Sequence, residues 1–194
     1  STLLRLLKPS VSPVGRISGV RLFEGRPLDA ADARTEAQKI GFIGQNPSDC
    51  VVTDTVWHEL AFGLESLGEP TEKIRARVAE IASYFGIADW FRKSTNTLSG
   101  GEEQLLCLAS VMVMQPTLLL LDEPTAKLDP IAAHRFLQSL SRVCRELGTT
   151  VLLSEHRLEE ALPLSDRVLV MENGRILADG SPRTVAETLC RQHN

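Results

Sequence analysis

The chain contains 194 residues, of which 43% are hydrophobic and 24% are charged, a balance typical of a folded globular protein and unlike that of disordered or fibrous chains. Lys and Arg number 21 against 25 Asp and Glu, and the formal charge of −4 disfavours nucleic-acid binding through bulk electrostatics. The longest apolar runs, such as residues 118–121, are far shorter than the roughly 20 residues that span a bilayer, so we expect no membrane-crossing segment.

The four cysteines are widely spaced in the sequence. Cys50, Cys107, Cys144 and Cys190 show none of the close pairing of a zinc site or a redox motif. We therefore expect reduced thiols in a cytosolic protein, most of them packed in the core.

The first 45 residues predict short elements. Residues 1–8 have the apolar spacing of two helical turns, and the alternation in residues 15–23 before Glu24-Gly25 predicts a short strand pair. Residues 29–37 are polar, and we expect them to be exposed. Residues 40–43 form a small apolar strand that runs into a polar loop beginning near Gln45, and loops of this kind commonly carry function.

The rest of the chain alternates helices and strands. Residues 55–98 read as a helical lobe whose second helix stops at Gly86. A strand at 118–121, a helix at 131–147, a strand at 151–153 and a short helix from Leu158 then predict an α/β fold with a parallel sheet. The last elements predicted are a hairpin turning at Asn173-Gly174, where Asn-Gly favours a tight turn, and a final helix at 183–190.

The apolar run 118–121 ends in two carboxylates, Asp122 and Glu123. An apolar run without alternation indicates a strand buried on both faces of a parallel sheet, and ligands bind at the carboxyl ends of such strands. One acid there can hold Mg²⁺ through its water shell and the next can act as general base toward a water. The alternative is structural: Asp122 caps the following loop and Glu123 is a solvated strand end.

The segment Ser99-Gly100-Gly101-Glu102 directly precedes an apolar helix. Ser99 can cap that helix, and the two glycines leave backbone N–H groups open to an anion at the helix N-terminus, which makes the segment a candidate phosphate cradle. The alternative is a capping box formed by Ser99 and Glu102, which needs no ligand.

Two further polar residues follow predicted strands. His156 follows the strand at 151–153 after two polar residues. At this position an imidazole can donate to a phosphate oxygen or hold a water. Gln45 can bind a metal-held water at the end of its own strand. Either residue by itself is more commonly structural.

The order of these motifs resembles the ATP-binding-cassette (ABC) ATPase family. Gln45 matches the Q-loop, residues 98–102 the signature, residues 118–122 the Walker B strand, Glu123 the catalytic glutamate, residues 126–129 the D-loop and His156 the switch histidine. Residues 54–65 and 155–160 are similar to the ATPase subunits of energy-coupling-factor importers, which take up vitamins or transition-metal ions.

The resemblance implies a P-loop NTPase fold that forms one ABC ATPase domain with its N-terminal strands missing. Its RecA-like parallel-sheet core is expected at 1–48 and 106–194, and an inserted helical signature subdomain at 49–105. The family's phosphate loop ends in Gly-Lys-Ser-Thr, of which Ser1 and Thr2 are present, so we expect these 194 residues alone to bind ATP poorly and to be inactive. Glu102 replaces the usual glutamine, and Lys127 stands where the D-loop has a small residue.

The resemblance also implies the site and its cofactors, ATP and Mg²⁺. Catalysis is expected from Glu123, His156 and Gln45, and metal binding from Ser1, Gln45 and Asp122. Nucleotide binding is expected from Ser1, Thr2, Gln45, Asp122 and His156 of one subunit and from Ser99, Gly100, Gly101 and Glu102 of a second ATPase subunit, identical or paralogous.

The implied activity is ATP hydrolysis that drives import through a transmembrane partner, at the cytoplasmic face of the membrane. Two alternatives remain open: a non-hydrolysing nucleotide-binding or regulatory subunit, suggested by the missing phosphate loop, and a soluble ABC ATPase that acts on ribosomes or DNA. The acidic composition disfavours the second of these.

Overall fold

The structure, a computed structural model, describes residues 1–192. The chain folds into two compact units, Ser1–Glu155 and a second unit that begins at His156. Across residues 1–192, none of the helices combines the length and the apolar character that a membrane span requires.

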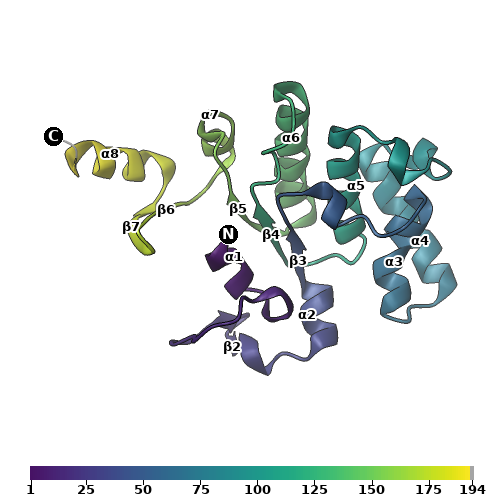
Figure 1. Cartoon of the computed structure of the whole chain (residues 1–194), viewed down its shortest axis with the longest axis horizontal. Helices are drawn as coiled ribbons and strands as arrows, with labels where there is room; N and C mark the ends of the chain where they lie inside the picture. Colours follow the sequence, from purple (N-terminus) through teal and green to yellow (C-terminus); the bar gives the residue numbers. More distant parts are fainter. Residues whose placement is uncertain (193–194) are drawn as a thin grey trace. The chain divides into compact units, whose positions relative to one another are not determined.

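The first unit is built on a three-stranded parallel sheet with the order β3-β4-β5 (Figure 1). These strands are β3 (Ile40–Ile43), β4 (Leu118–Asp122) and β5 (Thr150–Ser154). Helix α6 (Pro130–Leu147) connects β4 to β5 and ends at Gly148 in the left-handed conformation, as the glycine after its apolar stripe predicts. The prediction of a mixed α/β fold with a parallel sheet is confirmed.

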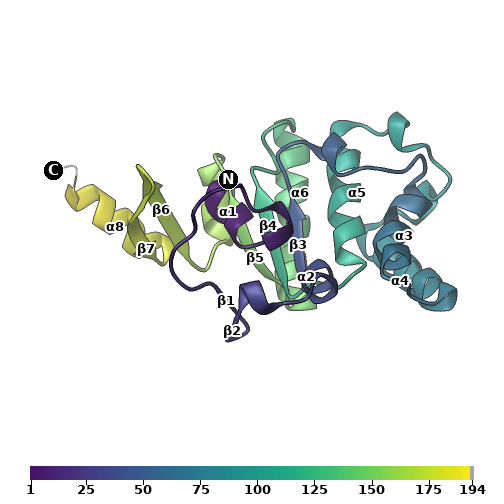
Figure 2. The ribbon, with the colours of Figure 1, turned by 60° about the horizontal axis from the view of Figure 1, so that its bottom comes forward.

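Strand β4 is buried on both faces, which explains its unbroken run of leucines. Leu119 and Leu121 belong to the large core that the helices on one side of the sheet share, whereas Leu120 packs with Leu4 and Ile40 in a smaller core on the other side. Figure 2 shows the three strands side by side, with the N-terminal helix next to them. Because successive side chains of a strand point to opposite faces of the sheet, the leucines of β4 enter the two cores alternately.

The large core continues into three helices, α3 (Val56–Ser66), α4 (Thr71–Phe85) and α5 (Gly100–Met112). Gly86 ends α4 in the left-handed conformation with φ 70°, which confirms the predicted stop. Figure 1 shows the three helices grouped together, with α5 beside the sheet.

Helix α5 approaches β3 so closely that Gly41 is required between them. A Cβ atom on Gly41 would lie 2.4 Å from Val111 Cγ1 and 2.9 Å from Leu119 Cδ1, well inside van der Waals contact. This contact fixes the distance between the signature helix and the strand that leads to Gln45.

The N-terminal part consists of α1 (Thr2–Leu6), β1 (Leu22–Phe23), β2 (Arg26–Pro27) and α2 (Ala33–Lys39). Strands β1 and β2 pair around the predicted turn at Glu24-Gly25. The expectation that residues 29–37 are exposed holds for 29–34, whereas Glu36 is buried and accepts a hydrogen bond from the Ser10 N–H at 2.9 Å. Asp32 caps α2 by accepting a hydrogen bond from the Thr35 N–H.

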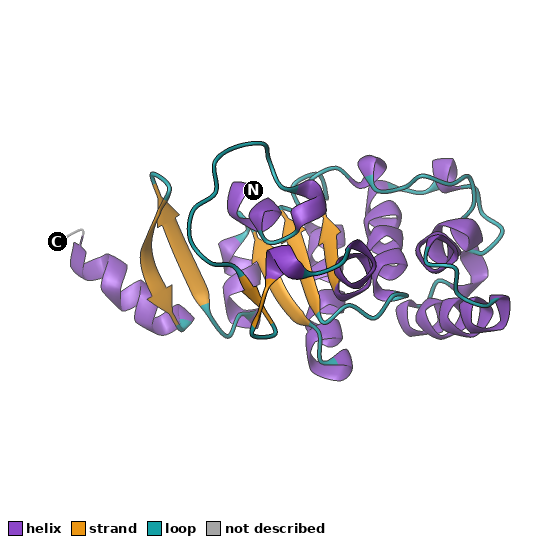
Figure 3. Cartoon of the chain, turned by 90° about the horizontal axis from the view of Figure 1, so that it is seen from below, coloured by secondary structure: helices purple, strands orange, loops and turns teal. Residues whose placement is uncertain are grey.

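The second unit contains α7 (Leu158–Ala161), β6 (Val168–Glu172), β7 (Arg175–Gly180) and α8 (Pro182–Gln192). Strands β6 and β7 form an antiparallel hairpin, and α8 packs against β7 (Figure 3). Asn173 and Gly174 have φ values of 49° and 76°, so the predicted Asn-Gly turn adopts the left-handed geometry that suits a tight hairpin.

Candidate functional site

The parallel register brings three predicted polar segments to one edge of the sheet. Ile43 pairs with Leu121, and Asp122 pairs with Ser154, so β3, β4 and β5 end nearly level. Gln45 follows β3, Asp122 ends β4, and Glu155 follows β5. The carboxyl edge of a parallel sheet is where ligands bind in open α/β folds, so this edge is the candidate site.

Ser1 and Asp122 meet at this edge. The hydroxyl of Ser1, which precedes α1, donates a hydrogen bond to Asp122 Oδ1 at 2.9 Å, and the Asp122 side chain is only 1% exposed. A buried carboxylate needs a polar partner, and the serine hydroxyl supplies it. The structure thus brings together two of the residues expected at the metal site, although they lie 121 positions apart in the sequence.

The Ser1 and Asp122 oxygens suit a magnesium ion whose remaining ligands come from a nucleotide and from water. Both groups are hard oxygen donors, and Mg²⁺ usually takes one or two protein oxygens together with waters and phosphate oxygens. Within residues 1–192 there is no group of three or more His, Cys, Asp and Glu side chains that would hold a metal by themselves. The donor set thus suits a nucleotide-bound Mg²⁺ and not a site made entirely of protein ligands.

Glu123 lies next to Asp122 in a strained backbone conformation. Its φ of 50° is in the left-handed region, which is uncommon for a residue other than glycine. The N–H of Glu123 donates to Ser154 O at 2.9 Å, and its carbonyl accepts from the Ala126 N–H at 3.1 Å. These bonds hold the conformation in place, and strain that the surroundings maintain in this way is concentrated at functional sites.

Thr125 joins the loop after β4 to the end of β5. The fully buried Thr125 hydroxyl donates to Glu155 Oε1 at 2.7 Å. Sequence reasoning did not identify Thr125, because nothing in the spacing of two residues 30 positions apart indicates that they touch. The bond ties the loop that contains Glu123 to the end of β5.

Gln45 is exposed at the same edge, and no hydrogen bond within residues 1–192 joins it to Ser1 or Asp122. The next residue, Asn46, accepts a hydrogen bond from Lys127 Nζ at 2.8 Å and donates to Asp49 Oδ1 at 2.8 Å. The unusual D-loop lysine therefore contacts the segment that follows Gln45.

Ser99 and Glu102 form the capping box that the sequence allowed. The Ser99 N–H donates to Glu102 Oε2 at 2.9 Å, and the Glu102 N–H donates to Ser99 Oγ at 3.4 Å. Hydrogen bonds from the Ser99 backbone and then from its hydroxyl lower the pKa of Glu102. The carboxylate is thereby held ionised at the start of α5, where the helix dipole also favours negative charge.

The signature segment lies exposed next to the start of α6. Ser99 and Gly100 are exposed, whereas a Cβ on Gly101 would lie 3.0 Å from Ala132 Cβ. No hydrogen bond within residues 1–192 joins residues 99–102 to Ser1 or Asp122. The segment is not part of the Ser1–Asp122 cluster of its own chain.

His156 is the first residue of the second unit, where its carbonyl accepts from the Leu158 N–H at 2.9 Å. Thr2 begins α1 next to Ser1.

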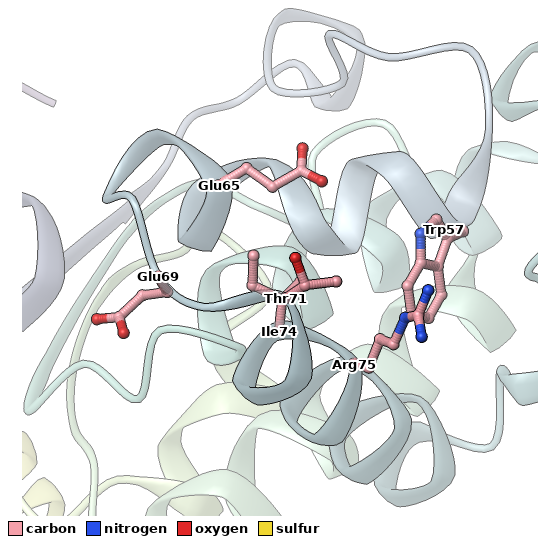
Figure 4. Close-up of a pocket in the computed structure, with 6 residues that line it drawn as sticks. All are labelled: Trp57, Glu65, Glu69, Thr71, Ile74 and Arg75. Carbon is pink, nitrogen blue, oxygen red and sulfur yellow. The ribbon is translucent and has the colours of Figure 1, made fainter.

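A pocket of about 400 Å³ lies between α3 and α4 in the helical region (Figure 4). Trp57 and Arg75 lie at one end of it and Glu69 at the other (Figure 4). A second pocket of about 400 Å³ borders the segment after Gln45 and includes Val51, Val52 and Glu103 in its lining.

Known proteins share both the sequence and the fold. A family model described as ABC transporter matches residues 1–126. A protein of Bacillus thuringiensis named as an ABC transporter ATP-binding protein is 50% identical over 189 residues, which are 97% of this chain and 34% of that protein. A similarly named protein of Methanosarcina acetivorans is 39% identical over 194 residues, 99% of this chain and 31% of its own length. The chain spans about a third of the length of these relatives.

The solved structure of cbiO1 from Clostridium perfringens, described as part of the ABC transporter complex cbiONQ, superposes with a TM-score of 0.81. It is 31% identical in sequence, and the match covers 91% of this chain and 72% of that one. The predicted P-loop NTPase fold of the ABC ATPases is confirmed. The family model and the related sequences show that the chain belongs to the ABC transporter family, with the fold of its ATPase domains.

Proposed function

We propose that this chain binds and hydrolyses ATP as a subunit or domain of an ABC-type importer, and that hydrolysis drives uptake of a vitamin or metal ion through a transmembrane partner. The observation that carries the hydrolytic part is the hydrogen-bonded pair of Ser1 and the buried Asp122, with Glu123 adjacent in its strained turn. The similarity to cbiO1, part of a transporter complex, supports the transport part.

In this mechanism Ser1, Asp122 and Gln45 would hold Mg²⁺, which would supply positive charge to neutralise the transferred phosphoryl group. Ser1 donates a hydrogen bond that orients Asp122, while Glu123 orients the attacking water and accepts its proton. His156 and the Ser99 segment of a second ATPase subunit, identical or paralogous, stabilise the developing negative charge. Ser1 and Thr2 match the end of the family's phosphate loop and would contribute their hydroxyl groups to the nucleotide site.

A test of the metal role is the Asp122→Asn variant of the protein at its native length. Loss of the carboxylate removes charge stabilisation worth several kcal/mol, so Mg²⁺-dependent ATP hydrolysis should fall by roughly 100-fold or more. Asp89→Asn, which changes an exposed aspartate in the helical region, is the matched control and should retain the full rate. Equal rates for the two variants would refute the assignment of Asp122.

The segment from Asn46 to Trp57 is proposed to transmit closure to the transmembrane partner, at the cytoplasmic face of the membrane. It runs from the candidate site to α3, borders both pockets, and exposes Val52 to 62%. Trp57 is half-buried and meets Phe91 edge-to-face with 5.3 Å between ring centroids. An exposed apolar surface next to a nucleotide site suits a partner helix.

The Trp57→Ala variant tests this coupling. It should reduce transport and co-purification of the membrane partner while ATP hydrolysis by the isolated ATPase remains within about twofold of the unaltered protein. Trp90→Ala, which removes a second half-buried tryptophan of the same helical region, is the control. If transport and partner binding in Trp57→Ala equal those of the control, this segment does not contact the partner.

A further inference from the structure

Two cysteines that are far apart in the sequence lie together beside the candidate site. Cys50 follows the short 3₁₀ helix Pro47–Asp49, and Cys107 lies in the middle of α5. Cys107 Sγ donates to Pro47 O at 3.5 Å, and the Cys50 N–H donates to the same carbonyl at 2.8 Å. Both cysteines thus contact the carbonyl of Pro47, and the side chain of each shifts the pKa of the other.

The two thiols differ in exposure. Cys107 is buried, with 1% of its surface exposed, whereas Cys50 is only partly buried. A small oxidant from solvent therefore reaches Cys50 first. Cys107 lies buried behind it, against the same Pro47 carbonyl that the Cys50 N–H contacts.

The surroundings also make the two sulfurs chemically different. The interaction with the Cys107 side chain, helped by a hydrogen bond from the Gly44 backbone, lowers the pKa of Cys50 to about 7, against the opposing effects of burial and of the Asp49 and Glu59 carboxylates. The Cys50 thiolate, burial and the nearby carboxylates Glu103 and Glu59 raise the pKa of Cys107. Near neutral pH, Cys50 is the nucleophile and Cys107 keeps its proton.

We propose that Cys50 and Cys107 form an oxidation site that hydrogen peroxide converts into a disulfide. The Cys50 thiolate attacks one peroxide oxygen, the O–O bond breaks, and the released hydroxide takes up a proton to become water. The sulfur of Cys107 then displaces the hydroxyl group of the resulting sulfenic acid, and its proton leaves with that group as a second water. Two thiols lose two electrons and two protons, and one peroxide becomes two waters.

The disulfide would link two segments that the proposed function depends on, and this consequence rests on that function. Cys50 lies five residues after Gln45, and Cys107 lies on the helix that Ser99 caps. Both cysteines are within two residues of the boundaries at 48–49 and 105–106 that the family resemblance predicts between core and helical subdomain. A covalent bond there would prevent the core and the helical region from moving independently, and ATP turnover needs such conformational steps.

The experiment treats the reduced protein, at its native length, with hydrogen peroxide and maps its tryptic peptides by mass spectrometry. Cleavage after lysine and arginine places Cys50 in the peptide 40–73 and Cys107 in the peptide 94–127. The expected product is the linked pair of these two peptides, lighter by two hydrogens than their sum, which separates again after dithiothreitol. ATP hydrolysis should fall in proportion to the linked fraction and return on reduction.

A double variant, Cys144→Ser with Cys190→Ser, leaves Cys50 and Cys107 as the only cysteines of these 194 residues and should form the link equally well. In Cys107→Ser the link is absent, and Cys50 should accumulate as sulfenic acid that dimedone traps. If the peptides 40–73 and 94–127 remain unlinked while the exposed Cys190 is oxidised, the site is refuted. A complete link with unchanged hydrolysis refutes its effect on the ATPase, and a reduced protein without hydrolysis refutes the proposed function but not the disulfide.

Discussion

Replacing Gly41 by alanine tests the contact that sets the distance between β3 and α5. The added Cβ would lie 2.4 Å from Val111 Cγ1 and 2.9 Å from Leu119 Cδ1, and ordinary contacts of this kind are longer than 3.4 Å. The Val111 side chain must therefore move by about 1 Å or the helix must shift, and overpacking of this kind costs about 1–3 kcal/mol. For a domain of this size we expect the melting temperature to fall by about 4–8 °C for a loss of 2 kcal/mol.

The assay is thermal and denaturant unfolding of Gly41→Ala beside Gly15→Ala, because a Cβ on Gly15 would meet no atom within 4 Å. Combining Gly41→Ala with Val111→Ala removes the shorter of the two clashes and should recover part of the lost stability in a double-mutant cycle. If Gly41→Ala unfolds at the same temperature as Gly15→Ala, or if Val111→Ala gives no recovery, the close approach of α5 to β3 is wrong.

Two other changes test the site loops. Thr125→Val keeps the shape of a fully buried residue but removes its hydrogen bond to Glu155, so the free energy of unfolding should drop by about 1–3 kcal/mol and ATP hydrolysis should fall. Thr125→Ser keeps the hydroxyl group and should retain both the stability and the hydrolysis. Identical unfolding curves for the valine and serine variants would contradict the role of this bond. The hydrogen bonds from Ser99 lower the pKa of Glu102 from 4.5, so the stability that they contribute is fully present above pH 4.5 and is lost as the pH falls through the lower pKa of the folded state. Glu102→Gln should therefore lose less stability than the unaltered protein between pH 5 and pH 3, and parallel curves would show that the capping carboxylate does not contribute.

The sequence predicted the elements whose patterns are dictated by their own residues. The unbroken leucines of β4 require two buried faces, and the glycines after α4 and α6 adopt the left-handed conformation that ends a helix. The Asn173-Gly174 turn follows from local preferences in the same way. Helix α2 was missed because it is short and polar, and its position depends on the contact between Glu36 and Ser10.

The site was predicted only in part, because some of its contacts join residues that are far apart in the sequence. Family resemblance identified Asp122 and Ser1 individually, and the structure brings them together. The contacts from Thr125 to Glu155 and from Lys127 to Asn46 join residues 30 and 81 positions apart, and no spacing rule predicts such pairs. Wide spacing of the cysteines likewise gave no indication that Cys50 and Cys107 meet, because the fold alone brings them together.

The most direct test of the account compares ATP binding and ATP hydrolysis in the Glu123→Gln variant of the protein at its native length. Glutamine keeps the size of the side chain but cannot accept the proton of the attacking water, and general-base catalysis contributes about 10²–10⁴-fold. We expect hydrolysis to fall by a factor in that range while the affinity for Mg²⁺-ATP stays within about threefold, and Glu72→Gln, an exposed glutamate of α4, should change neither. Undiminished hydrolysis in Glu123→Gln, or the absence of hydrolysis in the unaltered protein, would contradict the assignment of this sheet edge as an ATPase site.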